Sequence, residues 1–200
     1  MKKIILLLLI VLLNSCASKK QVHTGETEWQ REMNADFKDA TKSPLTEKDR
    51  ASFSGLDFFK YDSTYVVTAT LKLTPEAKKF KMKTSTDRLP EYVKYGVLFF
   101  ELKGKPYQLN IYQNIGLLEK EGYEDYLFLP FLDATNGDTT YGGGRYIECE
   151  IPKGNTMIIN FNEAFNPYCA YSGRYSCPIV PQEDQLPIKI EAGVKAYKKH

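Results

Sequence analysis

The apolar positions of this chain follow two different periods, and the change between them divides the sequence. Between Thr27 and Ala40, apolar residues recur at Trp29, Met33, Phe37 and Ala40. Spacings of four, four and three residues are typical of one face of an amphipathic helix. We therefore expect one N-terminal helix that packs against the rest of the domain.

Beyond Gly55 the period changes to two, which indicates half-buried strands. Lys103 and Gly104 should close one hairpin, and residues 152–155 should close a second one. The expected strands span residues 65–73, 79–83, 92–102, 105–112, 126–131, 146–151, 156–161 and 188–192. The pattern predicts a mainly β fold, a β-rich α+β arrangement in which an antiparallel barrel or sandwich carries the N-terminal helix. An aromatic content of 13% fits strands better than a helical bundle.

The first residues have the pattern of a targeting segment. Lys2 and Lys3 precede an apolar run over residues 4–13, which is shorter than the roughly 20 residues that a membrane-spanning helix needs. The next residues, 13–16 (LNSC), resemble a lipobox, in which the Cys sulfur receives diacylglycerol before the chain is cut. We expect a signal peptide over 1–15, a lipidated Cys16 with a polar tether over 16–25, and one domain over 26–200. An ordinary secretory signal is the alternative.

A lipid anchor on Cys16 would hold the domain to a membrane without a transmembrane helix. Ser18, in place of an Asp, favours the outer membrane by analogy with lipoprotein sorting. Lys19 and Lys20 favour a periplasmic orientation. The expected location is thus the bacterial cell envelope, on the outer membrane facing the periplasm.

Charge and histidine content exclude several functions. Without Lys2 and Lys3 the chain has as many basic as acidic residues, so no electrostatic case for nucleic acid remains. The two histidines, His23 and His200, lie in the tether and at the last position. A His-based zinc site or a Ser-His-Asp triad needs an imidazole on a rigid frame. We expect no metal and no cofactor.

The C-terminal half contains the candidate ligand-binding residues. Gly143 and its neighbours suit close approach to a ligand or a structural turn, and Arg145 could bind an anion or pair with Asp133 or Asp138. Asn side chains in this half could form a polar site or satisfy turns. The full candidate set is Asp133, Tyr141, Gly143, Arg145, Tyr146, Asn160, Asn162 and Tyr171.

The cysteines of this half allow two interpretations. Cys169 and Cys177 enclose a short segment, and a disulfide between them would contribute roughly 2.5 kcal/mol in the chain-entropy model. Cys149 would then be a buried free thiol. A metal site that uses all three cysteines is the alternative.

Three functional hypotheses follow. The first is a non-catalytic domain that binds a small anionic or aromatic ligand in a Tyr-lined cleft. The second is a hydrolase that uses Asp133 or Glu163 as general base and Arg145 for charge stabilisation. The third is an envelope scaffold or interaction protein, which would show a broad apolar surface patch. 

Long motifs in the C-terminal half resemble a known family. They are residues 127–146 (LFLPFLDATNGDTTYGGGRY), 160–171 (NFNEAFNPYCAY) and 175–178 (YSCP). They resemble the domain of unknown function 1684, which occurs in bacterial lipoproteins and in soluble actinobacterial proteins. The resemblance extends over nearly the whole chain after Cys16 and implies no particular activity. Two positions depart from it, since Asp184 stands where Asn is usual and Val194 where Glu is common.

Overall fold

The computed structural model describes residues 25–197, which form a mainly β domain. Its helices are α1 (Glu28–Lys38) and α2 (Glu47–Ala51). Its strands are β1 (Val66–Leu73), β2 (Phe80–Lys81), β3 (Glu91–Leu102), β4 (Lys105–Asn114), β5 (Tyr126–Phe131), β6 (Arg145–Glu150) and β7 (Thr156–Asn160). The predicted signal peptide and Cys16 lie outside the described residues. Within residues 25–197, no helix is long and apolar enough to cross a membrane.

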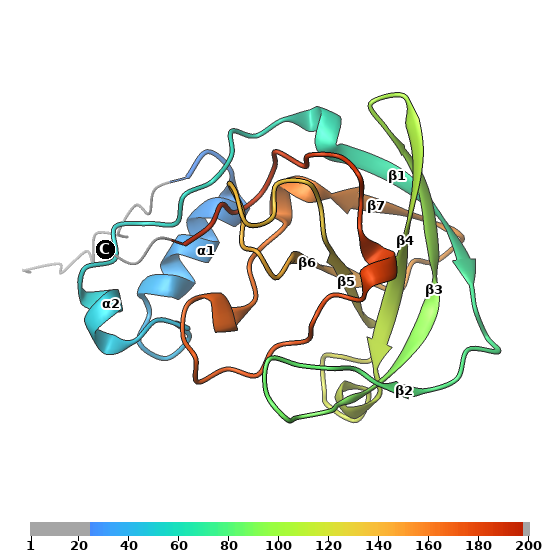
Figure 1. The fold of residues 1–200 in the computed structure, drawn as a ribbon, viewed down its shortest axis with the longest axis horizontal. Coiled ribbons are helices and arrows are strands. Elements are labelled where there is room, and N and C mark those ends of the chain that lie inside the picture. Colours follow the sequence, from blue (N-terminus) through green and yellow to red (C-terminus); the bar gives the residue numbers. More distant parts are fainter. Residues whose placement is uncertain (1–24, 198–200) are drawn as a thin grey trace, which may run out of the picture.

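The strands form one antiparallel sheet in the order β6-β5-β4-β3-β1-β7, and β2 pairs with β3 at the side. The sheet curls into a half-barrel, which confirms the mainly β fold with an N-terminal helix. In Figure 1, β1, β3 and β4 form the wall on the right, and α1 and α2 lie on the left. The C-terminal segment, drawn in red, runs between the two parts.

Helix α1 begins and ends as capping chemistry dictates. The Thr27 side chain accepts a hydrogen bond from the Gln30 amide at 3.2 Å, and the helix ends at Lys38, so Ala40 lies beyond it and is exposed. The buried residues are Gln30, Asn34 and, as predicted, Phe37, whereas Trp29 and Met33 are only half-buried. Asn34 is buried because its side-chain oxygen accepts the Leu56 amide at 2.7 Å. Of the apolar residues predicted to face the core, Trp29 and Met33 are therefore partly available for another contact.

One predicted hairpin is confirmed and the other is wrong. Strands β3 and β4 pair around Lys103 and Gly104, both of which have positive φ. Strand β6 pairs with β5 and strand β7 pairs with β1, so these consecutive strands stand at opposite ends of the sheet. The few residues between them span at most roughly 20 Å. The turn at 152–155 therefore joins the two edges of a curled sheet.

The expected last strand, near residues 188–192, is absent from the described chain. Ile190 and Ala192 are nevertheless fully buried, as the alternation predicts. The carbonyl oxygens of both residues accept hydrogen bonds from the Arg145 side chain, and not from a neighbouring strand. Inward-facing residues could be predicted here, but backbone pairing could not.

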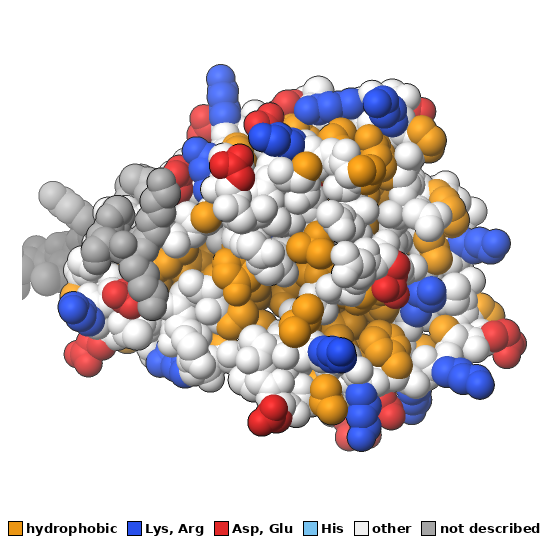
Figure 2. Space-filling view, in the orientation of Figure 1, with side chains coloured by type: hydrophobic (Ala, Val, Ile, Leu, Met, Phe, Trp, Pro, Cys, Tyr) orange, Lys and Arg blue, Asp and Glu red, His pale blue; other side chains and the backbone are white. Residues whose placement is uncertain are grey.

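Apolar side chains cover both faces of one part of the sheet. The main core fills the inside of the curl with residues such as Leu98, Ile111, Leu129 and Ile159. A second cluster lies on the opposite face of β4, β5 and β6 and contains Met82, Tyr92, Tyr112, Phe128, Tyr146 and Val180. Because β5 is covered on both faces, it is apolar at every position. In Figure 2, hydrophobic side chains gather across the middle of the face shown.

Candidate functional site

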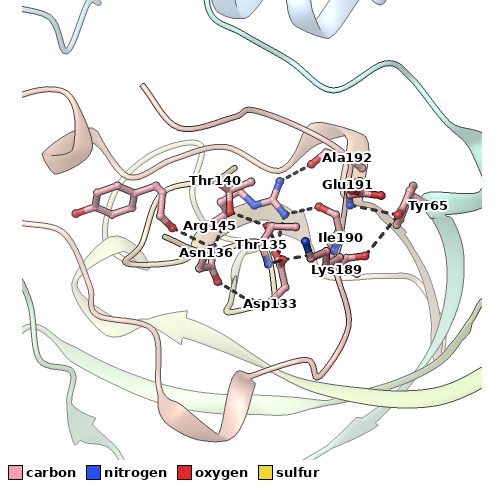
Figure 3. Close-up of polar contacts among 11 residues, drawn as sticks. Tyr65, Asp133, Thr135, Asn136, Thr140, Arg145, Lys189, Ile190, Glu191 and Ala192 are labelled. Atoms are coloured by element: carbon pink, nitrogen blue, oxygen red, sulfur yellow. Dashed lines mark hydrogen bonds and ion pairs between the residues drawn. The ribbon is translucent and has the colours of Figure 1, made fainter. Parts of the chain in front are cut away.

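Arg145 and Asp133 form a buried ion pair at the start of β6. Arg145 Nη2 donates to Asp133 Oδ2 at 2.6 Å, and both side chains are 0% exposed. Nη2 also donates to the Ile190 carbonyl at 2.8 Å, and Nη1 donates to the Ala192 carbonyl. Figure 3 shows the guanidinium enclosed between Asp133 and the C-terminal segment.

The Asp133 carboxylate is held from its other side by a turn. Its Oδ1 accepts hydrogen bonds from the amide of Thr135, at 2.6 Å, and from the Thr135 hydroxyl. The Ile190 amide contributes a longer bond to the same oxygen, at 3.4 Å. Arg145 was expected either to bind an anion or to pair with Asp133 or Asp138. In the structure it pairs with Asp133, and Asp138 pairs with Lys189 instead.

The glycine-rich turn packs against its own chain. A side chain at Gly143 would meet the ring of Tyr141 at 2.5 Å, so that ring occupies the space beside Gly143. The Tyr141 hydroxyl lies 3.8 Å from the sulfur of Cys169. This turn brings Tyr141 to the cysteines and does not bring Gly143 to a cavity.

Asn160 and Asn162 make structural contacts and do not face the cleft. The side-chain oxygen of Asn160 caps a short turn by accepting the Asn162 backbone amide at 3.1 Å. The side-chain nitrogen of Asn160 donates to the Glu163 carboxylate at 2.7 Å. The Asn162 side chain bonds both the amide and the carbonyl of Asp62, at 3.0 and 2.9 Å. These two residues tie β7 to the segment that precedes β1.

Tyr171 lies under α1. Its ring is 1% exposed and packs edge-on against Phe37, with centroids 4.7 Å apart. Asn166 donates to its hydroxyl at 3.3 Å. Of the eight candidate ligand residues, only Tyr146 lines the large cleft described next.

An aromatic cleft of about 600 Å³ lies between α1 and the second face of β5 and β6. Its wall contains a stack of rings, in which Phe128 and Tyr146 meet edge-on at 4.7 Å and Phe165 lies 6.0 Å from Tyr146. Tyr168 and Tyr123 are each 42% exposed and belong to its lining. Trp29 and Met33 of α1 form part of the remaining wall. Trp29 and Met33, the apolar residues of α1 that are only half-buried, thus face this cleft.

The charged residues of the cleft are mostly acidic. They are Glu32, Asp36, Glu148, Glu163 and Lys42. Lys42 is the one basic residue of this lining, and it pairs with Asp36 at 2.7 Å. Glu148 accepts a hydrogen bond from the Tyr126 hydroxyl at 3.3 Å, and desolvation within the cleft raises the pKa of its carboxyl. The lining therefore has an excess of negative charge that no basic side chain of the cleft balances.

Sequence reasoning missed Trp29, Tyr126, Glu148 and Tyr175 as cleft residues. Two signals could have found them. Residues 126–131 are apolar at every position, which predicts a strand covered on both faces. Polar Gln30 and Asn34 also come directly after Trp29 and Met33 in the helix. More than one face of the helix therefore contacts other parts of the domain.

Asp184 is a buried carboxylate outside the cleft. It is 0% exposed, and it accepts hydrogen bonds from the Tyr112 hydroxyl at 2.6 Å and the Asn110 amide at 2.7 Å. Burial raises the pKa of Asp184 to about 6, against the opposing effect of these two donors. An Asn side chain could keep both contacts, because the Tyr112 hydroxyl can rotate to accept.

We expect Asp184→Asn to remove a pH dependence of stability. A carboxyl whose pKa is raised on folding holds a proton in the folded state between about pH 4 and pH 6 that the unfolded state has lost. The wild-type free energy of unfolding should therefore fall, by on the order of 2 kcal/mol, as pH rises through this window. Urea unfolding at several pH values measures this. Glu150→Gln, at an exposed carboxylate that has no part in the pKa shift of Asp184, is the control, and equal slopes for wild type and Asp184→Asn would contradict the expectation.

The fold and the buried ion pair define a class of protein: a single curled antiparallel sheet, locked by Arg145, with an aromatic cleft on its outer side. Residues 51–195 match the model of a protein family of unknown function, DUF1684. The chain belongs to this family.

Among solved structures, the chain is similar to an uncharacterized protein of Haloarcula marismortui whose solution structure was determined by NMR. The two are 31% identical, with a TM-score of 0.66, over 86% of this chain and 92% of that one. No curated protein matches the chain. The relatives thus support the fold and the family and name no activity.

Proposed function

We propose that this domain binds a small ligand in the aromatic cleft between α1 and strands β5 and β6. The observation that carries this proposal is the cleft itself. Its volume of about 600 Å³ lies in the range of small-molecule sites, which combine apolar and aromatic walls with a few polar groups. Trp29, Tyr126 and Tyr168 supply rings, and Glu148 supplies a carboxylate.

The charge of the lining favours an aromatic or cationic ligand over an anionic one. An anion would meet several carboxylates and a lysine that is already paired with Asp36. A cation would gain from Glu148 and from the faces of the tyrosine rings, which attract positive charge. Arg145, which the sequence suggested as an anion ligand, is fully buried and is not a lining residue of the cleft.

The proposal can be tested by fluorescence, because Trp29 is the single tryptophan of the chain and lines the cleft. Tyramine, p-cresol and 4-hydroxyphenylacetate share one ring and differ in charge, so titrating each reports the charge preference directly. We expect tyramine to bind most tightly and 4-hydroxyphenylacetate most weakly. Glu148→Gln should weaken tyramine binding about threefold to tenfold, which corresponds to roughly 1 kcal/mol for one charge contact.

Glu150→Gln is the matched control, because Glu150 lies on the same strand, is exposed and is not a lining residue of the cleft. It should leave all three affinities unchanged. Tyramine binding should also strengthen as pH rises through the raised pKa of Glu148, since the carboxylate then becomes charged. If none of the probes changed the Trp29 emission, or if the anion bound best, the proposed ligand class would be wrong.

We further propose that Cys16 carries a lipid anchor that holds this domain at the outer membrane, facing the periplasm. The support is the sequence of residues 1–20, which lie outside the described structure. In a bacterial host, the wild-type protein should fractionate with membranes, and Cys16→Ala should not. Mass spectrometry of the mature N-terminus provides the decisive measurement. A mature chain that starts anywhere other than Cys16 would contradict the anchor.

A further inference from the structure

Two cysteines meet where the glycine-rich turn packs on the segment after β7. The Cys169 backbone amide donates to the sulfur of Cys177 at 3.2 Å, which brings the Cys177 thiol against Cys169. Both are free thiols in this structure, so the predicted disulfide remains a prediction. Cys169 is half-buried and Cys177 is 8% exposed.

The sulfur of Cys169 is surrounded by donors. The Tyr141 hydroxyl oxygen lies 3.8 Å from it, and the nearby Cys177 thiol and Ser85 hydroxyl also act to lower the pKa of Cys169. Ser85 is held in place because its hydroxyl accepts the Cys177 amide at 3.1 Å. Donors aimed at one sulfur favour its thiolate, and hydrogen bonding lowers the pKa of Cys169 to about 6. The pKa of Cys177 is raised, which keeps that sulfur protonated.

Cys149 provides an internal contrast. It lies on β6 among apolar side chains of the main core, and burial raises its pKa to about 12. The described chain thus holds one inert thiol and one pair of unequal thiols. Accessible thiolates beside a second cysteine are the usual arrangement of redox-sensitive sites.

We propose that Cys169 and Cys177 form a redox-active dithiol site, in which Cys169 attacks a hydroperoxide and Cys177 closes the disulfide. In the first step the Cys169 sulfur bonds to one peroxide oxygen, the O–O bond breaks, and the other oxygen leaves as hydroxide or alkoxide and takes a proton from solvent. In the second step the Cys177 sulfur displaces hydroxide from the sulfenic acid, and the Cys177 proton completes a water molecule. The two sulfurs lose two electrons and the peroxide gains them.

The site is distinct in its chemistry from ligand binding in the cleft, although Cys177 contributes to the cleft wall. The disulfide expected from sequence is the oxidised form of this pair. We assign Cys169 as the attacking sulfur because it is the more exposed of the two and contacts the Tyr141 hydroxyl, and Cys177 as the resolving one. Tyr141 acts as a positioning residue that stabilises the Cys169 thiolate.

The test starts from the purified protein, reduced with dithiothreitol and desalted. One equivalent of hydrogen peroxide should link Cys169 to Cys177 with the loss of two hydrogens, seen by peptide mass spectrometry. In Cys177→Ser the reaction should stop at a sulfenic acid on Cys169, which dimedone traps. In Cys169→Ser, Cys177 should stay reduced on the same timescale. Cys149 should stay unmodified throughout and serve as the reference.

The pH profile of alkylation distinguishes a thiol whose pKa is lowered by its surroundings from a thiol that is only exposed. At pH 6.5, iodoacetamide should modify Cys169 about fivefold faster than an ordinary thiol, after allowing for the lower nucleophilicity of a more acidic thiol. Tyr141→Phe should move the midpoint of the profile to higher pH. The proposal is overturned if Cys169 alkylates with the profile of an ordinary thiol, if Tyr141→Phe leaves that profile unchanged, or if peroxide oxidises Cys177 first.

Discussion

Replacing Arg145 with methionine is expected to lower the free energy of unfolding by about 3 to 5 kcal/mol, the usual cost of leaving one partner of a buried ion pair uncompensated. The variant keeps most of the volume of the side chain but leaves the fully buried Asp133 without its cation. It also leaves the Ile190 and Ala192 carbonyls without their donors. A domain stabilised by about 5 to 15 kcal/mol would lose a large part of its margin. Urea unfolding monitored by circular dichroism measures the loss.

Two further variants test whether the missing charge causes this loss. Arg145→Met combined with Asp133→Leu should recover much of the stability, because it removes both buried charges together. Lys189→Met, which breaks an exposed pair with Asp138 at 3.7 Å, should cost less than about 1 kcal/mol. If Arg145→Met were as mild as Lys189→Met, Arg145 would not lock the fold as described.

The second large effect is expected at Gly144, directly before this arginine. Gly144 has φ of +88°, and an added Cβ would lie 2.6 Å from Val180 Cγ2 and 2.7 Å from the Phe131 carbonyl oxygen. The left-handed backbone costs an alanine roughly 1 to 2 kcal/mol, and the clash with fixed backbone adds to it. We therefore expect Gly144→Ala to destabilise the protein by about 2 to 4 kcal/mol in the same unfolding experiment.

Gly142 offers a matched control two residues earlier. A Cβ there would find its nearest neighbour, the Gly137 Cα, at 3.7 Å, and the backbone does not require positive φ. Gly142→Ala should therefore change the stability by less than about 1 kcal/mol. Equal losses for the two variants would show that the triplet tolerates alanine without regard to the conformation at Gly144.

The sequence allowed the elements to be predicted better than their partners. Alternation located β1, β3 and β4, a continuous apolar run located β5, and Lys103 with Gly104 located one hairpin, because period and turn chemistry are local. The pairing of β6 and β7 was predicted wrongly, since the turn at 152–155 looks the same whether it closes a hairpin or joins two edges of a curled sheet. The segment at 188–192 was mistaken for a strand because its carbonyls bond to a side chain distant in sequence.

The candidate site was harder to predict for a related reason. The residues singled out in the C-terminal half are mostly those that hold the fold, such as Arg145, Asn162 and Tyr171, since buried polar groups and glycines are as distinctive in sequence as ligand contacts. The cleft instead combines α1 with β5 and β6, and single positions such as Trp29 and Glu148 carry no mark of their role. Only the three-dimensional arrangement brings them together.

The hydrogen bonds from Arg145 also make its buried site depend on the last segment of the domain. Ile190 and Ala192 follow every strand of the sheet along the chain, and their carbonyls accept hydrogen bonds from the two Nη atoms of the buried guanidinium. A nascent chain that ends before this segment holds an arginine that cannot be buried at low cost. The complete ion-pair site therefore joins β6 to the far end of the domain, and a chain that stops before Ile190 cannot assemble it.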